Sequence, residues 1–122
     1  MAFESSYGQS KIDIDGKAGF SPKALLLSGL AGCSGIDVVE ILEKMRVPFA
    51  GLEIEVETEQ TEGPPKVFRD IQINYILTAA EENRDKIKKA IDLSLEKYCG
   101  VSAMLQKHSG IHYIITLREE AS

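Results

Sequence analysis

Apolar and polar residues alternate with a period of two along several stretches of the chain, which is typical of half-buried strands. This alternation predicts five strands, at residues 2–8, 11–15, 51–60, 67–78 and 111–118. In the third stretch Glu53, Glu55 and Glu57 share one face. We interpret that acidic row as a solvated sheet face, with a binding surface as the alternative. A loop with Gly63, Pro64 and Pro65 follows it, so the third and fourth strands are expected to form a long antiparallel hairpin.

A helical period begins at residue 22 and predicts a helix to about residue 46. Ser21 is suited to the N-cap and Pro22 to the first helical position, and Pro48 requires the helix to stop before it. The first half is apolar on every side and the second half is amphipathic. An all-apolar segment is typical of a buried helix, so we expect a long central helix inside the fold.

A second helix is predicted over residues 81–98, and Gly100 interrupts the pattern before a short helix at 101–107. The order β(β)αββααβ defines an α+β fold, with an antiparallel sheet packed on the central helix. The second helix is expected to bury one stripe and to expose Lys86, Lys88 and Lys89. The stripe consists of Ile87, Ala90, Ile91, Ser94, Leu95 and Tyr98.

The chain has 122 residues, so we expect a single domain over residues 1–122. Its net charge of −5 argues against nucleic acid as a partner, because phosphate binding needs clustered lysine and arginine. We find no uninterrupted apolar run of the ~20 residues that span a membrane. The N-terminus lacks the features of a signal peptide, so we expect the cytoplasm, where cysteines are mostly reduced.

The chain has two cysteines, each in a distinctive context. Cys33 lies among glycines in the first helix, and Cys99 lies where a new helix begins. A helix N-terminus stabilises a thiolate, and small neighbours leave room for a substrate or a second element near a sulfur. The alternative is that both thiols are inert core residues, and that the glycines permit close packing between elements.

Metal binding is weakly supported by the sequence. No CxxC or HExxH motif is present. His108 and His112 are four residues apart, but Gly110 lies between them and the second histidine falls in a predicted strand. We therefore expect no metal and no cofactor.

The segments SPKALLLSGLAGCSGIDVVEIL and EKYCGVSAML resemble the two cysteine segments of the OsmC/Ohr family. The resemblance covers residues from about 20 to 117. The residues IDVV after Cys33 and EKYC up to Cys99 are similar to the OsmC-like branch typified by YhfA. The resemblance implies an OsmC-like fold and an intertwined homodimer with active sites at the subunit interface.

The resemblance also implies the reduction of organic hydroperoxides by two cysteines. Cys33 matches the cysteine that attacks the peroxide and Cys99 the one that resolves it as a disulfide, which an external dithiol then reduces. Leu26, Leu27 and Leu30 would form an apolar substrate pocket. This chemistry requires no metal or cofactor.

The chain departs from the family pattern at two assisting residues. Where the family's peroxidases carry a glutamate before the first cysteine, this chain has Lys23 and Ala24. Residues 1–32 contain no counterpart of the family's N-terminal arginine. Lys23 is one candidate replacement and Glu96 another, with a surface lysine and a surface glutamate as the alternatives. A stress-associated or small-molecule-binding protein on the same fold therefore remains the second functional hypothesis.

Overall fold

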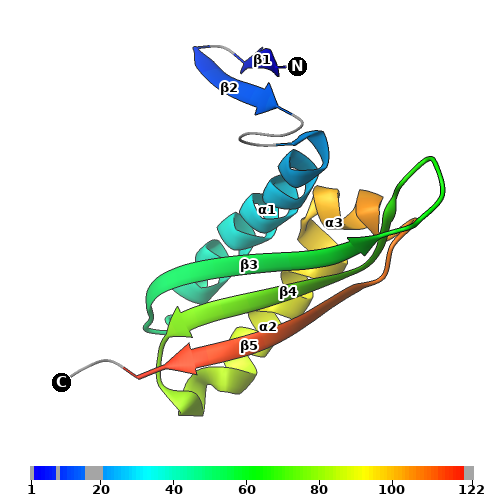
Figure 1. Ribbon diagram of the computed structural model, residues 1–122. Coiled ribbons are helices and arrows are strands. Elements are labelled where there is room, and N and C mark those ends of the chain that lie inside the picture. Colours follow the sequence, from blue (N-terminus) through cyan, green and yellow to red (C-terminus); the bar gives the residue numbers. More distant parts are fainter. Residues whose placement is uncertain (1, 8, 16–20, 120–122) are drawn as a thin grey trace.

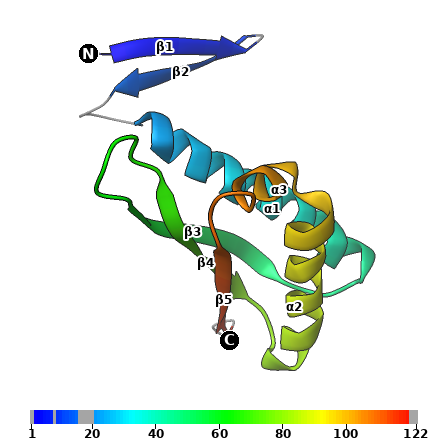
Figure 2. The same cartoon turned by 90° about the vertical axis from the view of Figure 1, so that its right-hand side faces the viewer.

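Three helices cover one face of a three-stranded sheet in the computed structural model, which describes residues 2–7, 9–15 and 21–119 (Figures 1 and 2). The elements follow the predicted order. They are β1 (Ala2–Tyr7), β2 (Ser10–Asp15), α1 (Pro22–Lys44), β3 (Ala50–Gln60), β4 (Phe68–Thr78), a 3-10 turn η1 (Glu81–Asn83), α2 (Arg84–Leu93), a π turn η2 (Ser94–Tyr98), α3 (Gly100–Leu105) and β5 (Ile111–Arg118).

The sheet has the strand order β3-β4-β5, and its central strand β4 supplies much of the core. β3 and β4 form the predicted antiparallel hairpin, with Val56 opposite Ile73. β4 and β5 are parallel, with Ile71 beside Ile111, so the expectation of a wholly antiparallel sheet is wrong. The helices between β4 and β5 return the chain to the end of the sheet where β4 began, and such a crossover permits parallel pairing.

β1 and β2 form a separate antiparallel hairpin in which Ala2 pairs with Asp15. The hairpin stands apart from the main sheet, beyond the N-terminal end of α1 (Figure 1). It forms a two-stranded sheet of its own, and an isolated hairpin is marginally stable in water. The described part of the chain therefore leaves this hairpin with little support from its own domain.

α1 begins and ends as its sequence predicts. The Ser21 hydroxyl accepts a hydrogen bond from the Ala24 N–H at 3.2 Å, which caps the N-terminus. At the other end Arg46 adopts a left-handed conformation with φ of 58°, and the Val47 N–H donates to the Leu42 carbonyl at 3.0 Å. This is a Schellman motif, which closes the helix just before Pro48.

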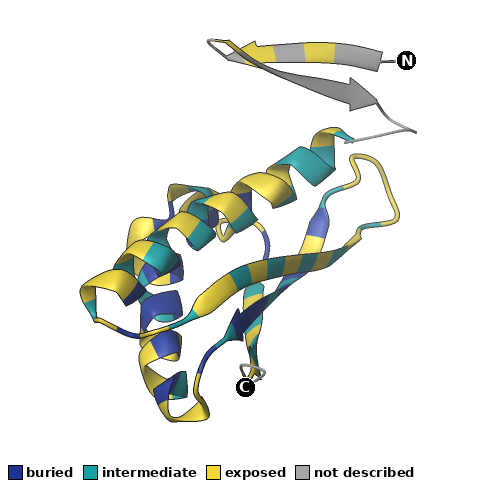
Figure 3. Cartoon of the chain, turned by 90° about the vertical axis from the view of Figure 1, so that its left-hand side faces the viewer, coloured by how far each residue is buried: buried dark blue, intermediate teal, exposed yellow. Residues whose placement is uncertain are grey.

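α1 is buried along one stripe only, formed by Leu30, Ser34, Val38 and Leu42 at intervals of four residues. Leu26 is 51% exposed and Ile36 is 63% exposed. Figure 3 shows exposed residues at intervals along the whole length of α1. The expectation of a helix buried on all sides is therefore wrong for a single copy of the protein. A three-stranded sheet and two short helices cover only one side of a 23-residue helix.

The apolar character of α1 has a second consequence. By length and composition alone this helix is able to cross a membrane, although no single uninterrupted apolar run suggested it. Core helices of soluble proteins meet the same criterion, and α1 packs its buried stripe against its own domain.

The predicted second helix is divided into three parts. After η1, α2 carries the expected buried residues Ile87, Ala90 and Ile91, and the helix then widens into the π turn η2. Tyr98 was expected in the buried stripe but is 56% exposed, because a π turn shifts the phase of the residues that follow it. The break before α3 falls at Cys99, whose backbone is extended, and Gly100 is already helical.

Candidate active site

The fold brings the two cysteines together although they are far apart in the sequence. Cys33 lies in the middle of α1, which crosses the segment where η2 leads into α3. The two sulfurs and a carboxylate oxygen of Asp37 all lie within 4.8 Å of one another. Both thiols are free. Cys33 is half-buried and Cys99 is only 3% exposed, so the pair lies at the edge of the core.

Cys99 occupies the N-cap of α3, as its position in the sequence predicts. Its sulfur accepts a hydrogen bond from the Ser102 N–H at 3.3 Å. Burial nevertheless dominates and, together with the neighbouring Cys33, raises the pKa of Cys99 from 9.0 to about 11, although the Ser102 and Val101 N–H groups lower it. Desolvation of this thiol therefore outweighs the hydrogen bonds that the start of α3 offers to its thiolate.

Asp37 is a site residue that the sequence analysis did not identify. It lies one helical turn after Cys33, and one of its carboxylate oxygens accepts a hydrogen bond from the Ser94 hydroxyl at 3.2 Å. The Cys33–Asp37 spacing of four residues places both side chains on one face of a helix, and this spacing was a signal in the sequence. The serine comes from η2, so the carboxylate is held between two elements.

A buried hydroxyl network supports this arrangement. The Ser34 hydroxyl lies 2.6 Å from the Tyr75 hydroxyl and 2.9 Å from that of Ser94, and all three side chains are fully buried. Burial raises the pKa of Tyr75 to about 12, although its hydrogen bond to Ser34 lowers it. The network links α1, β4 and η2 beside the thiols, and it therefore fixes the geometry of the elements that carry them.

The glycines around Cys33 had two interpretations, close packing between elements or open space beside the sulfur, and the structure supports each at different positions. A side chain at Gly35 would place its Cβ 3.0 Å from the Ile54 Cδ1 atom, so this glycine permits close contact between α1 and β3. The same test finds open space at Gly29 and Gly32. Packing within the domain thus explains one of the three glycines, and the other two lie on surface that the domain does not use.

The two candidate assisting residues lie in different surroundings. The Lys23 ammonium donates a hydrogen bond to the Gln60 side chain at 2.8 Å, at the N-terminal end of α1. Glu96 is exposed on η2. It lines, together with Cys99, a surface cavity of about 400 Å³ whose other walls are Leu95, Lys97, Tyr98, Gly100, Ala103, Gln106 and Lys107. Glu96 therefore shares a cavity with Cys99, and Lys23 is hydrogen-bonded to Gln60.

The three leucines expected to form a substrate pocket do not share one. Leu30 is fully buried in the core. Leu26 lines a groove of about 270 Å³ with Phe68 and Met104. Leu27 packs against β3 at a separate hollow. Leu26 and Leu27 are adjacent on the helix and point in different directions, and Leu30, although on the same face as Leu26, lies in the core, so an apolar run alone does not define a pocket.

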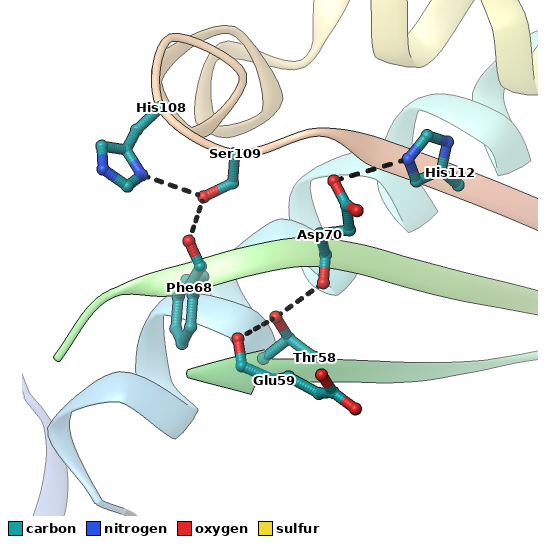
Figure 4. Close-up of polar contacts among 7 residues, drawn as sticks. All are labelled: Thr58, Glu59, Phe68, Asp70, His108, Ser109 and His112. Carbon is teal, nitrogen blue, oxygen red and sulfur yellow. Dashed lines mark hydrogen bonds and ion pairs between the residues drawn. The ribbon is translucent and has the colours of Figure 1, made fainter. Parts of the chain in front are cut away.

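The two histidines contact different partners (Figure 4). The Nδ1 atom of His108 lies 3.4 Å from the Ser109 hydroxyl, and the Nε2 atom of His112 lies 3.7 Å from a carboxylate oxygen of Asp70. The first contact lies within the segment between α3 and β5, where the Ser109 hydroxyl also donates to the Phe68 carbonyl at 3.0 Å, and the second joins β5 to β4. The histidines therefore act separately in this structure.

Comparison with known proteins identifies the family. The model of the family described as OsmC-like protein matches residues 14–113. The chain belongs to the OsmC-like family. It is 38% identical over 107 residues to Protein YhfA of Escherichia coli (strain K12), a match that covers 85% of this chain and 79% of that protein. This similarity supports the YhfA-type branch.

Solved structures agree with this assignment. A hypothetical protein from Aquifex aeolicus VF5 has a TM-score of 0.82 and 26% identity, with 99% of this chain and 97% of that chain covered. An OsmC-like protein from Mycoplasma pneumoniae has a TM-score of 0.82 and 23% identity, covering 95% and 88%. The organic hydroperoxide resistance protein OhrB of Bacillus subtilis shares the fold at 16% identity, with a TM-score of 0.62 and coverage of 97% and 96%.

Proposed function

We propose that this OsmC-like protein reduces organic hydroperoxides with Cys33 and Cys99. The observation that carries the proposal is the approach of two free thiols from distant segments to within 4.8 Å. A disulfide requires its cysteines to be neighbours in space, and a small side-chain movement completes the approach. Hydroperoxide resistance in the name of a structural relative agrees with this chemistry.

The proposed reaction has three steps. The Cys33 thiolate attacks the distal oxygen of the hydroperoxide, the O–O bond breaks, and the alkoxide leaves as an alcohol after taking up a proton. The resulting sulfenic acid reacts with the Cys99 sulfur, which forms the disulfide and releases water. An external dithiol then reduces the disulfide by exchange and becomes oxidised itself.

Asp37 is the group best positioned to move the proton. Its carboxylate lies within 4.8 Å of both sulfurs, and Ser94 holds it in place. We assign it the role of accepting the Cys33 proton and returning it to the leaving alkoxide. The carboxylate thus stands in for the assisting pair that the chain lacks. Lys23 has no part in this scheme, because its ammonium binds Gln60.

The cavity beside Cys99 fits the reducing step. Cys99 and Glu96 both line it, and its volume of about 400 Å³ is within the range of small-molecule sites. A dithiol entering there would attack the Cys99 sulfur of the disulfide. The cytoplasm, where thiol reductants maintain such pairs, is the compartment that we propose for this activity.

A homodimer belongs to the same proposal. The exposed apolar residues Leu26 and Ile36 on α1, the open space at Gly29 and Gly32, and the isolated β1–β2 hairpin are all features that a second copy would cover. An exchanged hairpin would give the intertwined arrangement. The partner would then cover the half-buried face of Cys33 and complete an apolar substrate site.

A second function deserves a test because Cys99 is buried and holds its proton strongly. On that hypothesis the protein binds a small molecule without turning it over. Single substitutions distinguish the two. Under the proposed mechanism Cys33→Ser abolishes hydroperoxide consumption, whereas Cys99→Ser permits one turnover and leaves a sulfenic acid on Cys33 that mass spectrometry detects.

The matched control is Ser28→Cys in the Cys33→Ser background, which restores the number of thiols on α1 at an exposed position that lines a hollow with β3 and not the cavity beside Cys99. The mechanism predicts that this variant stays inactive. Consumption by both single serine variants at the wild-type rate would instead exclude the thiols as the catalyst. A wild-type rate no higher than that of the hydroperoxide without protein would favour the binding function.

A further inference from the structure

The candidate active site contains three groups that are able to bind a metal ion. The proposed peroxidase mechanism uses the redox chemistry of the two thiols and the proton transfer of the carboxylate, and it does not use their capacity to bind a metal. Cys33, Asp37 and Cys99 offer two sulfurs and one carboxylate oxygen, all within 4.8 Å of one another. In a zinc site the metal lies about 2.3 Å from sulfur and about 2.0–2.2 Å from a carboxylate oxygen. Ligand atoms around one such ion lie roughly 3.5–4 Å apart, so rotation of one or two side chains closes the site.

The placement of the ligands favours chelation. Cys33 and Asp37 are one turn apart on α1, which is long and capped at both ends. Cys99 approaches from the start of α3, where the Ser102 N–H fixes its sulfur. Two ligands from a rigid helix and a third from a separate, anchored segment form a preorganised group of three ligands.

A second shell is also present. The Ser94 hydroxyl donates to one carboxylate oxygen of Asp37 at 3.2 Å, which leaves the other oxygen available to a ligand. Ser94 is itself held by Ser34, and Ser34 by Tyr75, all fully buried. Carboxylate ligands in metal sites are commonly oriented by such outer hydrogen bonds.

The charge balance of the site points to a cation. Two thiols and one carboxylate converge here, and all three are negatively charged when ionised. A divalent ion would neutralise both thiolates at once. Thiolates select zinc and similar soft ions over magnesium or calcium.

We propose that the reduced protein binds one zinc ion, or a comparable thiophilic divalent cation, through Cys33, Cys99 and Asp37. Three protein ligands leave the fourth tetrahedral position open. Metal binding and disulfide formation use the same sulfurs and exclude each other. Oxidation of the two thiolates to the disulfide by a hydroperoxide consumes two protons and yields an alcohol and water. The metal ion is then released, because the disulfide sulfurs no longer bind it. The binding itself does not depend on the proposed peroxidase function.

The test is titration of the reduced, metal-free full-length protein with Co²⁺ under an anaerobic phosphine reductant. The proposal predicts saturation at one equivalent per chain, a thiolate-to-cobalt charge-transfer band in the near ultraviolet, and displacement of cobalt by one equivalent of zinc. Binding should also release protons from the thiols, which an unbuffered titration measures. The disulfide form should bind neither ion.

Substitutions locate the site. Asp37→Asn should weaken zinc binding at least about tenfold, and Cys99→Ser should remove the charge-transfer band contributed by that sulfur. Asp85→Asn, at an exposed aspartate on α2, is the matched control and should bind like the wild type. Circular dichroism verifies that each variant is folded, and Asp37→Glu, which keeps a carboxylate, should retain part of the affinity.

Two results would overturn the proposal. One is a reduced wild type that shows neither the charge-transfer band nor zinc binding in competition with a chromophoric chelator. The other is undiminished affinity in folded Asp37→Asn, which would exclude the carboxylate as a ligand. Neither result affects hydroperoxide consumption by the metal-free protein, so a failure of this proposal is distinct from a failure of the peroxidase function.

Discussion

Replacement of Ser34 by alanine should destabilise the protein more than replacement of Tyr75 by phenylalanine, although both remove one hydroxyl from the same hydrogen bond. The Ser34 hydroxyl has two partners, Tyr75 at 2.6 Å and Ser94 at 2.9 Å. Within the described part of the chain, Ser34 is the one hydrogen-bond partner of the Tyr75 hydroxyl. The two substitutions therefore leave different groups behind.

The magnitudes follow from what remains buried. In Tyr75→Phe, Ser34 keeps its bond to Ser94, so the free energy of unfolding should fall by about 1 kcal/mol, the net value of one hydrogen bond. In Ser34→Ala, a fully buried phenol is left without a partner, which costs about 1–3 kcal/mol. In the double variant no phenol is stranded, so its loss should be smaller than the sum of the two single losses.

Equilibrium unfolding in urea, followed by far-ultraviolet circular dichroism, measures these differences. The protein concentration must be the same for all variants, because self-association contributes to stability. Tyr98→Phe is the control, since this tyrosine is 56% exposed and its change should stay within about 0.5 kcal/mol. Equal losses in the two single variants, or strict additivity in the double variant, would refute the role assigned to the network.

Three further predictions concern the thiols, the dimer and the proton acceptor. Because burial raises the pKa of Cys99 to about 11, the unfolded chain loses the thiol proton at a lower pH than the folded chain does. The free energy of unfolding should therefore fall as the pH rises from about 9 to about 11. In urea titrations, metal-free Cys99→Ala should lose less of this free energy over the same range. Ile36→Glu places a charge on the exposed face of α1 and should convert a dimer to monomers in sedimentation velocity, whereas Glu40→Gln should not; a wild-type monomer at micromolar concentration would contradict the dimer. Asp37→Asn should slow hydroperoxide consumption by about 10²-fold or more in the metal-free protein and Lys23→Ala should leave it unchanged, and equal rates in stopped-flow assays would exclude the proton-transfer role.

Local patterns in the sequence were sufficient to predict most elements of the fold. The alternation of residues 51–60 predicted β3, and the Ser21-Pro22 pair predicted the start of α1, because both signals act over a few neighbouring residues. The direction of β5 was beyond such signals, since a period of two is the same in parallel and antiparallel strands. The exposure of Tyr98 depends on the π turn, in which one extra residue is inserted into a helical turn. The sequence contains no clear pattern that predicts this insertion.

The candidate site shows a similar division. The sequence segments around Cys33 and Cys99 resemble those of a family with paired thiols, but their separation along the chain contains no information on distance. Only the packing of α1 against η2 and α3 brings the sulfurs together. Asp37 is on the same helix face as Cys33 and was accessible to sequence reasoning, whereas its bond to Ser94 joins two elements and was not. Leu30 shows the opposite error, because an apolar residue near a site is more often part of the core.

Anaerobic thiol titration tests the central claim most directly. The chain has two cysteines, so the reduced wild-type protein should react with two equivalents of a thiol reagent per chain after denaturation. If Cys33 attacks the peroxide and Cys99 resolves the sulfenic acid, one equivalent of an alkyl hydroperoxide per chain should remove both thiols, and the product should contain an intramolecular Cys33–Cys99 disulfide. Persistence of both thiols after exposure to the hydroperoxide would contradict the two-cysteine mechanism.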